Sequence, residues 1–393
     1  GHMIKNYLKI AYRNIKKHKG YSLINVAGLA IGMACCILIL LFVFDELSYD
    51  KFHENHDRIY RVTRKWLNED GVVNLHLRHI APSIGPLLEN DFPEILHTVR
   101  TIRIERLLVG NNSVFFEEPR FFFAEEDVFK VFTFNMTAGD PETALQDPFT
   151  IVITEEMAEK FFGAEDPIGK SLIIQVPPQK ADMKVMGVIK SLPHNSHFHA
   201  DFLGSFKTYE AVVGEQEMQS WVSNNFATYL LMSENYDINR LKSQLDPFID
   251  RHMSQGMSER TKLQLQPLTD IHLHSHLDSK IEANSDIMYV YVFSIIAFFV
   301  LLIAWPMAYL VMSRWLQNFA YRSGIGLGTF LLAGGLAWVI AFLTVSYRVI
   351  RASLEDPVKA LKYEQGRQPC PNHNCLFKKI KSDLETWDLL LYD

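Results

Sequence analysis

The sequence predicts a membrane protein with about three transmembrane helices and an α+β extracytoplasmic domain. Three observations lead to this fold class. Residues 23–44 are mostly apolar and carry no charge, and about twenty such residues at 1.5 Å each cross a hydrocarbon core of roughly 30 Å. Two further apolar runs follow at 287–312 and 325–346. Between the first two runs, residues 50–285 alternate between strand-like and helix-like patterns.

The charges that flank the first apolar run predict its orientation. Residues 1–20 contain six basic side chains and no acidic one, whereas Asp45, Glu46 and Asp50 follow the run. Basic flanks stay in the cytoplasm, so residue 50 onward is expected outside. A cleaved signal peptide is the alternative, but the run is too long and no Ala-x-Ala precedes the acidic flank. We therefore interpret 21–46 as transmembrane helix 1.

Residues 3–20 are predicted to form a cytoplasmic amphipathic helix. Apolar side chains recur at helical spacing from Ile4 to Ile15, and the basic side chains take the other face. Such a helix leading into a span is typical of the cytoplasmic membrane surface. The alternative is a solvated helix that carries only the orientation charge.

Residues 50–285 are acidic, with 23 Lys and Arg against 35 Asp and Glu in a chain whose net charge is −6. This balance argues against nucleic acid as a partner, because phosphates require a basic surface. The segment has no cysteine, since the four cysteines are Cys35, Cys36, Cys370 and Cys375. The outside domain is therefore expected to depend on its apolar core and not on disulfides.

Strand and helix patterns divide the outside domain into two parts. Strands are predicted at 58–66, 98–108, 114–123, 149–154, 171–176, 184–189, 227–232 and 262–268. Helices or helical turns are predicted at 81–88, 125–131, 155–162 and 237–253, the last two capped by Thr154 and Asp237. Strand–helix–strand patterns at both ends, around a strand-rich middle, predict a βαβ membrane-proximal part with a strand-rich insert.

The remaining spans are predicted from the C-terminal third. Residues 287–312 form transmembrane helix 2, which Pro306 would kink, and 325–346 form transmembrane helix 3. Gly28 and Gly32 in the first span, with Gly324 and Gly328 at the start of the third, are the expected helix-packing positions, because small residues let helices approach closely. Residues 347–393 form a basic segment and a tail. Three spans leave this end outside, whereas its basic residues favour the cytoplasm.

Two histidine groups and a cysteine pair are candidate metal ligands. His272, His274 and His276 alternate, so in a strand they would share one face, with Asp270 and Asp278 beside them. A second group contains His194, His197 and His199, and the tail carries Cys370, His373 and Cys375. Because no convergent set of four ligands accompanies any of them, the favoured interpretation is no metal site. Exposed or hydrogen-bonded histidines near the membrane face are expected instead.

No catalytic or nucleotide-binding motif is recognised. The stretch GAEDPIGKS at 163–171 lacks a P-loop glycine at Ala164, carries Glu165 and Asp166 where phosphate would bind, and precedes a predicted strand. Paired acids such as Glu125-Glu126 and Glu155-Glu156 are interpreted as solvated faces. The chain is therefore not expected to be an enzyme, and no cofactor is expected in it.

Several segments resemble the MacB/FtsX-like permeases of ABC transporters. These are NYLKIAYRNIKKHKGYSLINVAGLAIGMA, DELSYDKFHENHDRIYRV (45–62), EKFFGAEDPIGKSL (159–172), VMGVIKSLPHNSHFHADFLGSF (185–206) and LQPLTDIHLHSHL (265–277). They resemble the long two-repeat type with a MacB-like extracytoplasmic core domain. Residues 303–364 resemble the last spans of the same proteins. The family's basic cytoplasmic loop between spans two and three is missing, which indicates an internal deletion.

The resemblance implies a permease subunit of an ABC-type export or mechanotransmission system in the bacterial inner membrane, with the large domain in the periplasm. It implies a separate cytoplasmic ABC ATPase that hydrolyses ATP, contacts of 3–18 and 353–362 with that ATPase, and pairing as a homodimer or with a second permease, among membrane lipids. The missing loop favours an alternative, a membrane-anchored binding or signalling module without transport activity. The transported substrate is not indicated.

Overall fold

The computed structural model describes residues 19–317 apart from 106, 112–113, 177–178, 222, 276 and 278–284, together with Arg13 and Lys16. The chain divides into two compact units after Leu302. Of the second unit, only residues 303–317 are described, and they complete the last helix. The predictions for residues 325–393, most of 3–18, His276 and Asp278 lie outside the described residues.

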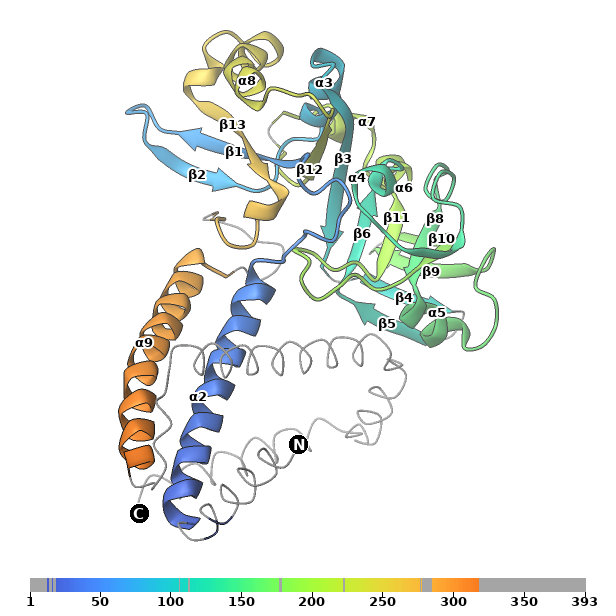
Figure 1. The fold of residues 1–393 in the computed structure, drawn as a ribbon. Coiled ribbons are helices and arrows are strands. Elements are labelled where there is room, and N and C mark those ends of the chain that lie inside the picture. The colour runs from blue at the N-terminus through green and yellow to red at the C-terminus, as the bar shows by residue number, and fades with distance from the viewer. Residues whose placement is uncertain are drawn as a thin grey trace, which may run out of the picture. The chain divides into compact units, whose positions relative to one another are not determined.

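A four-stranded antiparallel sheet with two helices forms the first part of the domain (Figure 1). Its elements are β1 (Ile59–Leu67), α3 (Ile84–Asp91), β3 (Ile95–Ile104), β12 (Ala227–Met232), α8 (Ile238–His252) and β13 (Thr261–Pro267). The strand order is β13-β1-β12-β3. Each helix therefore crosses over one strand, in the double split β-α-β arrangement. Strand β2 (Val73–Leu77) pairs with the end of β1.

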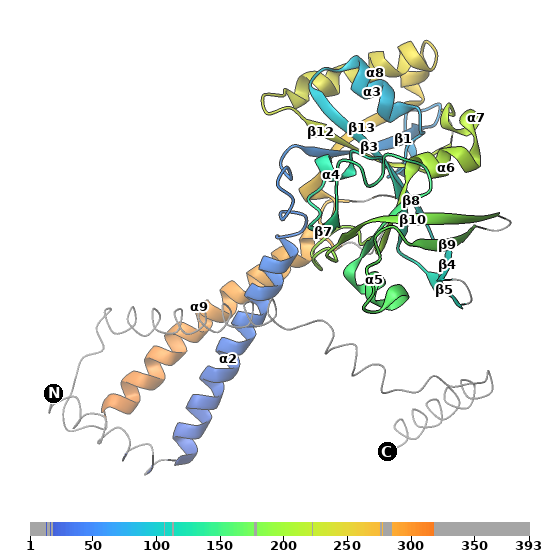
Figure 2. The same ribbon diagram turned by 90° about the vertical axis from the view of Figure 1, so that its right-hand side faces the viewer.

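The helices lie on one side of this sheet because their apolar faces meet the same strands. Figure 2 shows α3 and α8 on a common side. Leu88 of α3 and Phe248 of α8 are fully buried against Val62 of β1, in one cluster with Leu230 and Leu263. Fully burying such a side chain stabilises the fold by roughly 1.5–3 kcal/mol. Periodic leucines and phenylalanines thus fix both helices on the sheet.

The strand-rich insert lies between β3 and β12 in the chain. It contains β4 (Leu107–Asn111), β5 (Val114–Glu118), β6 (Phe121–Ala124), α4 (Val128–Val131), β7 (Met136–Gly139), β8 (Thr150–Thr154), α5 (Glu155–Phe162), β9 (Ser171–Val176), β10 (Gln179–Ile189), β11 (Phe202–Ser205), α6 (Phe206–Val213) and α7 (Glu215–Met218). Pairing of β3 with β6 continues the sheet into the insert, so all described strands belong to one hydrogen-bonded sheet. The predicted α+β domain with an inserted middle is therefore present.

Several predicted boundaries were wrong for identifiable reasons. The strand predicted at 114–123 is two strands, because Pro119 cannot donate to a ladder. The strand predicted at 98–108 ends at Ile104, and its last residues belong to a separate strand, β4. This strand pairs with β5 and β9, whereas β3 pairs with β12 and β6. The first helix starts only at Ile84 and runs through Asp91. Both predicted caps are correct, since Thr154 accepts from Met157 and Asp237 from Asn239 and Arg240.

Two long helices border the domain in the chain. Helix α2 covers Lys19–Glu46 and α9 covers Ile287–Gln317. The rings of Phe42 and Phe293 meet edge to face with centroids 5.1 Å apart. No helix in the described part of the chain is long and apolar enough to cross a membrane. Crossing of a membrane by 21–46, 287–312 and 325–346 stays a prediction.

Candidate functional site

The segment that leaves α2 enters the domain through a buried aspartate. Asp50 is completely buried, and its backbone amide donates to the carbonyl of Asn195 over 2.8 Å. Its φ of 59° lies in the left-handed region, which Asp and Asn adopt more readily than most residues. The chain therefore turns sharply between α2 and β1, and the turn is anchored on a distant loop.

A chain of hydrogen bonds extends from Asp50 into the core. The carboxylate accepts from the backbone amide of His197 over 3.0 Å and from its Nδ1 over 2.8 Å. His197 Nε2 lies 2.8 Å from the Tyr229 hydroxyl. Burial raises the pKa of Tyr229 to about 12, so this phenol stays protonated beside His197. Because an ionised carboxylate can only accept, the Nδ1–H of His197 donates to Asp50.

Opposing effects act on the Asp50 carboxylate. Burial disfavours its charged form, but the charge of His197, its two hydrogen bonds and the nearby His53 outweigh burial and hold the pKa of Asp50 below its usual value. Asp50 therefore remains ionised inside the protein. A buried carboxylate held in this way is costly to separate from its partner.

His53 is the second buried group of the same turn. Its Nδ1 accepts from the backbone amide of Thr133 over 3.0 Å, and its ring meets Phe132 edge to face. Burial lowers the pKa of His53 to about 3, despite the attraction of Asp50. His53 is therefore neutral at pH 7, and it fixes the segment after α2 to the segment after α4.

Three more contacts bind the end of α2 to the domain. His194 Nε2 lies 2.6 Å from an Asp45 carboxylate oxygen, and His272 Nε2 lies 3.1 Å from Glu46. The ring of Tyr49 stacks on His272 with centroids 3.3 Å apart. We call these groups together with Asp50, His53, His197 and Tyr229 the α2 joint. Burial lowers the pKa of His272, while Glu46 acts in the opposite direction.

The α2 joint explains the histidine groups that the sequence offered as metal candidates. His194 binds Asp45 in the last turn of α2, His197 binds Asp50 after it, His199 binds the carbonyl of Pro193, and His274 approaches Asp270. These side chains do not converge, and the described residues hold no cluster of three potential metal ligands. Of these histidines, His194 binds an acid in the last turn of α2 and His197 binds one just after it.

The start of α9 is connected to the same network. Arg61 of β1 is buried and donates from one Nη2 to Gln266 over 2.7 Å and to Ser275 over 2.9 Å. The amide of Ile287, the first residue of α9, donates to the carbonyl of Leu273. The segments that join both long helices to the sheet are therefore hydrogen-bonded to the domain within a few residues of each helix end.

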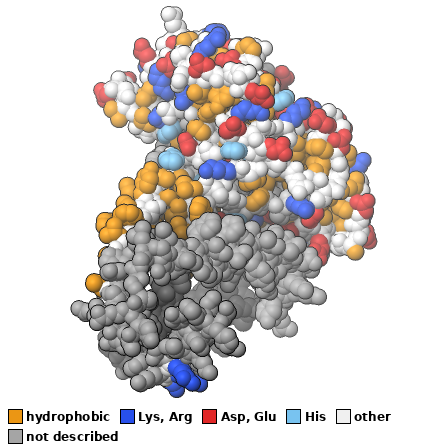
Figure 3. Space-filling model, in the orientation of Figure 1, with side chains coloured by type: hydrophobic (Ala, Val, Ile, Leu, Met, Phe, Trp, Pro, Cys, Tyr) orange, Lys and Arg blue, Asp and Glu red, His pale blue; other side chains and the backbone are white. Residues whose placement is uncertain are grey.

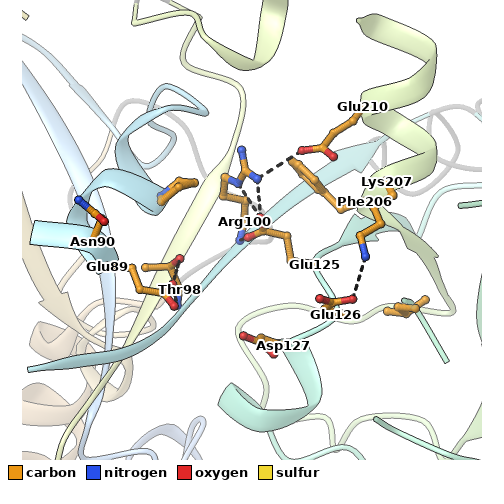
Figure 4. Close-up of a pocket in the computed structure, with 12 residues that line it drawn as sticks. Glu89, Asn90, Thr98, Arg100, Glu125, Glu126, Asp127, Phe206, Lys207 and Glu210 are labelled. Carbon is orange, nitrogen blue, oxygen red and sulfur yellow. Dashed lines mark hydrogen bonds and ion pairs between the residues drawn. The ribbon is translucent and has the colours of Figure 1, made fainter. Parts of the chain in front are cut away.

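A second feature is a cavity of about 520 Å³ between the first part of the domain and the insert (Figure 4). At its centre Arg100 of β3 binds Glu125, with its backbone amide 2.7 Å from Oε2 and its Nε 2.9 Å from Oε1. Arg100 also donates to the carbonyl of Pro82 and lies over the ring of Phe206. Burial raises the pKa of Glu125, although Arg100 acts against it. This pair joins the two parts of the domain.

The other acids around this cavity also have partners. Glu89 accepts from the amide and hydroxyl of Thr98, Glu126 accepts from Lys207, and Asp127 binds His97 and Lys130. The interpretation of Glu125-Glu126 as a solvated face was wrong for Glu125. Its ion pair could be anticipated only from the position of Arg100 on the neighbouring strand, which local patterning does not reveal.

The remaining candidate positions stay predictions. No described atom lies within 4 Å of the position that a Cβ would take at Gly28 or Gly32, and Gly324 and Gly328 lie outside the described residues. In the stretch 163–171, Gly163 ends α5 with a φ of 64° and Ser171 opens the strand β9. A phosphate-binding loop would need a helix after that position.

Comparisons with known proteins found one matching family and several similar solved structures. The family model for the MacB-like periplasmic core domain matches residues 22–248. Among solved structures, a domain assigned to a permease protein from Porphyromonas gingivalis is 22% identical, with a TM-score of 0.47, over 59% of this chain and 100% of that chain. The periplasmic region of MacB from Actinobacillus actinomycetemcomitans is 17% identical, with a TM-score of 0.37, over 53% and 89%.

The extracellular domain of YknZ, a noncanonic ABC-type transporter from Gram-positive bacteria, is 13% identical with a TM-score of 0.34, over 52% of this chain and 99% of that chain. A search of curated proteins found no match. The family model covers more than half of the chain and includes α2, the α2 joint through Tyr229, and most of α8. The chain therefore belongs to the family of the MacB-like periplasmic core domain.

Proposed function

We propose that this chain is the permease subunit of an ABC-type export or mechanotransmission system. A separate cytoplasmic ATPase hydrolyses ATP, and the resulting movement passes through α2 and α9 to a periplasmic domain. The α2 joint is the observation that carries this proposal. A helix that ended in a flexible linker could move without moving the domain, whereas the joint binds the end of α2 through buried groups.

The joint favours transmission because it contacts three separate regions of the domain. Asp50 binds His197, Glu46 binds His272, and His53 binds the amide of Thr133. Each of these links buries at least one of its groups, and a buried polar group left without its hydrogen-bond partner costs about 1–3 kcal/mol. Movement of α2 would therefore be passed to the domain as a rigid-body displacement between two states.

We place α2 and α9 in the bacterial inner membrane. Supporting this, Leu38 and Phe44 of α2 are 65% and 67% exposed, and Phe298 of α9 is 61% exposed, which is unusual for large apolar side chains in a protein surrounded by water. Figure 3 shows apolar side chains over α9. The 3–18 and 353–362 segments would face the ATPase, and the chain would pair with a second copy or a second permease among membrane lipids.

Two measurements on the full chain test this function. An affinity-tagged chain is purified from its native bacterium in mild detergent, with and without a non-hydrolysable ATP analogue, and the associated proteins are identified by mass spectrometry. A reporter fused after residue 365 gives the side of the membrane on which the C-terminus lies. We expect an ABC ATPase subunit and a cytoplasmic reporter.

An outside reporter with no ATPase under any detergent or nucleotide condition would contradict the permease function. That outcome would favour the anchored binding or signalling module, which the missing cytoplasmic loop supports. Metal analysis of protein purified without chelator, showing neither zinc nor copper, would separately exclude a metal-binding function.

A further inference from the structure

Strand β13 ends the sheet and pairs with one described neighbour, β1. In an antiparallel ladder, successive residues direct their backbone groups alternately toward and away from the neighbouring strand. The amide of Leu67 donates to the carbonyl of Arg260, one position beyond the Trp66–Thr261 pair that ends the ladder. Lys262, Gln264 and Gln266 therefore face β1, whereas Leu263 and Leu265 direct their backbone amides and carbonyls to the free edge.

The other side of β1 confirms this alternation. The amide of Met232 donates to the carbonyl of Arg58, so even-numbered residues of β1 face β12 and odd-numbered residues face β13. Within the described residues, β13 pairs with no strand other than β1, and no turn or loop hydrogen bond involves the outward amide or carbonyl of Leu263 or Leu265. These four groups form an unpaired strand edge, which natural proteins usually cover or protect.

The edge opens into a groove of about 610 Å³. Leu263, Leu265 and Pro267 of β13 line it, with Lys242 and Leu245 of α8 on one side and Thr63 and Lys65 of β1 on the other. The side chains of Leu263 and Leu265 are buried in the core under α3 and α8. Only the backbone of these leucines is therefore available to a strand lying in the groove.

The charges of the groove are not balanced by the described part of the chain. Of the acids near it, Asp246 binds Lys262 and Asp270 lies 3.5 Å from His274, and neither is bound to Lys65 or Lys242. Lys65 and Lys242 have no acidic partner among the described residues. Figure 3 shows basic side chains over β1 and β13. An occupant of this groove would therefore be favoured by negative charge.

We propose that the β13 edge is a docking site where an extended acidic segment of a partner protein adds as a further strand. The outward groups of Leu263 and Leu265 supply four backbone hydrogen bonds, and Lys65 and Lys242 select acidic side chains. A second copy of β13 is disfavoured, because it would bring the same lysines together across the interface. This proposal does not depend on coupling to an ATPase.

Hydrogen exchange with mass spectrometry at single-residue resolution tests the edge in the full chain in detergent. The probe is a blocked seven-residue peptide in which threonine alternates with glutamate. In the free chain, we expect the amides of Leu263 and Leu265 to exchange at least tenfold faster than those of Lys262 and Gln264. With saturating peptide, the two leucine amides should slow at least tenfold, while the lysine and glutamine amides change little.

Matched peptides and variants separate strand addition from general charge attraction. A peptide with lysine in place of glutamate, and one N-methylated on alternate amides, should bind at least tenfold more weakly. The double variant Lys65→Glu and Lys242→Glu should bind the acidic peptide more weakly by a similar factor. Lys190→Glu, which changes an exposed lysine outside the groove, should bind the peptide as tightly as the unchanged chain.

Two results would overturn the proposal, and neither requires a variant to fold. The first is equal protection of all four amides in the free chain, since the edge would then already be covered. The second is peptide binding that leaves the Leu263 and Leu265 amides unprotected, because the peptide would then lie elsewhere.

Discussion

Replacing Asp50 with alanine tests whether the α2 joint is as tightly held as its geometry indicates. The change removes the acceptor of two hydrogen bonds and leaves the His197 amide and Nδ1–H unpaired in a buried site. Removing one partner of a buried pair costs about 3–5 kcal/mol. Alanine at a φ of 59° adds roughly 1–2 kcal/mol of backbone strain.

Two further substitutions separate these contributions. In Asp50→Asn the side chain keeps an acceptor oxygen, and asparagine tolerates this backbone conformation. Only the charge is lost, and we expect the free energy of unfolding to fall by about 1–2 kcal/mol. Asp50→Gly also removes the side chain but relieves the strain. It should be about 0.5–1 kcal/mol less destabilising than alanine, after the greater freedom of glycine in the unfolded chain is subtracted.

Thermal unfolding of the full chain, followed by circular dichroism in detergent, measures the effect. For a domain of this size, each kcal/mol shifts Tm by roughly 2–4 °C, so Asp50→Ala should lower Tm by on the order of 10 °C. The control is Asp57→Ala, on the same segment with an exposed side chain, which should shift Tm by about 1 °C or less. If both variants shift Tm equally, the buried contacts do not hold the joint and the transmission argument fails.

Three other predictions follow from the buried groups. The pKa of His53 is about 3 in the folded chain and about 6.5 in the unfolded chain. Between these pH values the unfolded chain binds a proton that the folded chain does not. The free energy of unfolding should therefore fall by on the order of 5 kcal/mol as the pH drops from 7 to 3. Urea titrations across this pH range should show that the stability of His53→Asn, whose amide oxygen replaces Nδ1, depends less steeply on pH than that of the control His56→Asn. Parallel curves for the two variants would contradict a lowered pKa at His53. Arg100→Ala should lower the free energy of unfolding by about 3–5 kcal/mol in the same assay, and adding Glu125→Gln should recover part of this loss by removing the uncompensated carboxylate. The control is Arg240→Ala, which changes an exposed arginine of α8 and should have little effect. A double variant less stable than Arg100→Ala would be inconsistent with a buried ion pair. Asp237→Ala should cost about 1 kcal/mol by leaving the Asn239 and Arg240 amides uncapped, measured against Glu234→Ala just before the helix, and equal stability of the two variants would argue against the cap.

Local chemistry in the sequence was sufficient for the strand–helix–strand patterns at both ends of the domain, although the strand order came only from the structure. The periods of β1, β12, α8 and β13 are each set by residues within one element, and the caps at Thr154 and Asp237 act on amides two or three residues away. The resemblance of 45–62 and 185–206 to the MacB/FtsX-like permeases was equally a property of contiguous segments. The family match to residues 22–248 agrees with it.

The strands of the insert were harder to predict, because short apolar runs do not specify their neighbours. Val114–Phe123 contains two strands that pair in different places, and only the ladder shows that β6 joins β3 while β5 joins β4. Strands β2, β7 and β11 were not anticipated, since each has only four or five residues. Strand pairing depends on distant segments, and local patterning carries little information about it.

The sequence by itself determined the apolar runs, the acidic balance of residues 50–285, the strand–helix–strand patterns around an insert and the family resemblance, because these depend on neighbouring residues or on contiguous stretches. Only the tertiary structure decided what the histidines do. His197 meets Asp50 across 147 residues of sequence and His272 meets Glu46 across 226. Spacing along the chain could show that histidines cluster, but it could not show that their partners are acids at the end of α2. The same holds for the free edge of β13, since an edge exists only once every strand has found its neighbours.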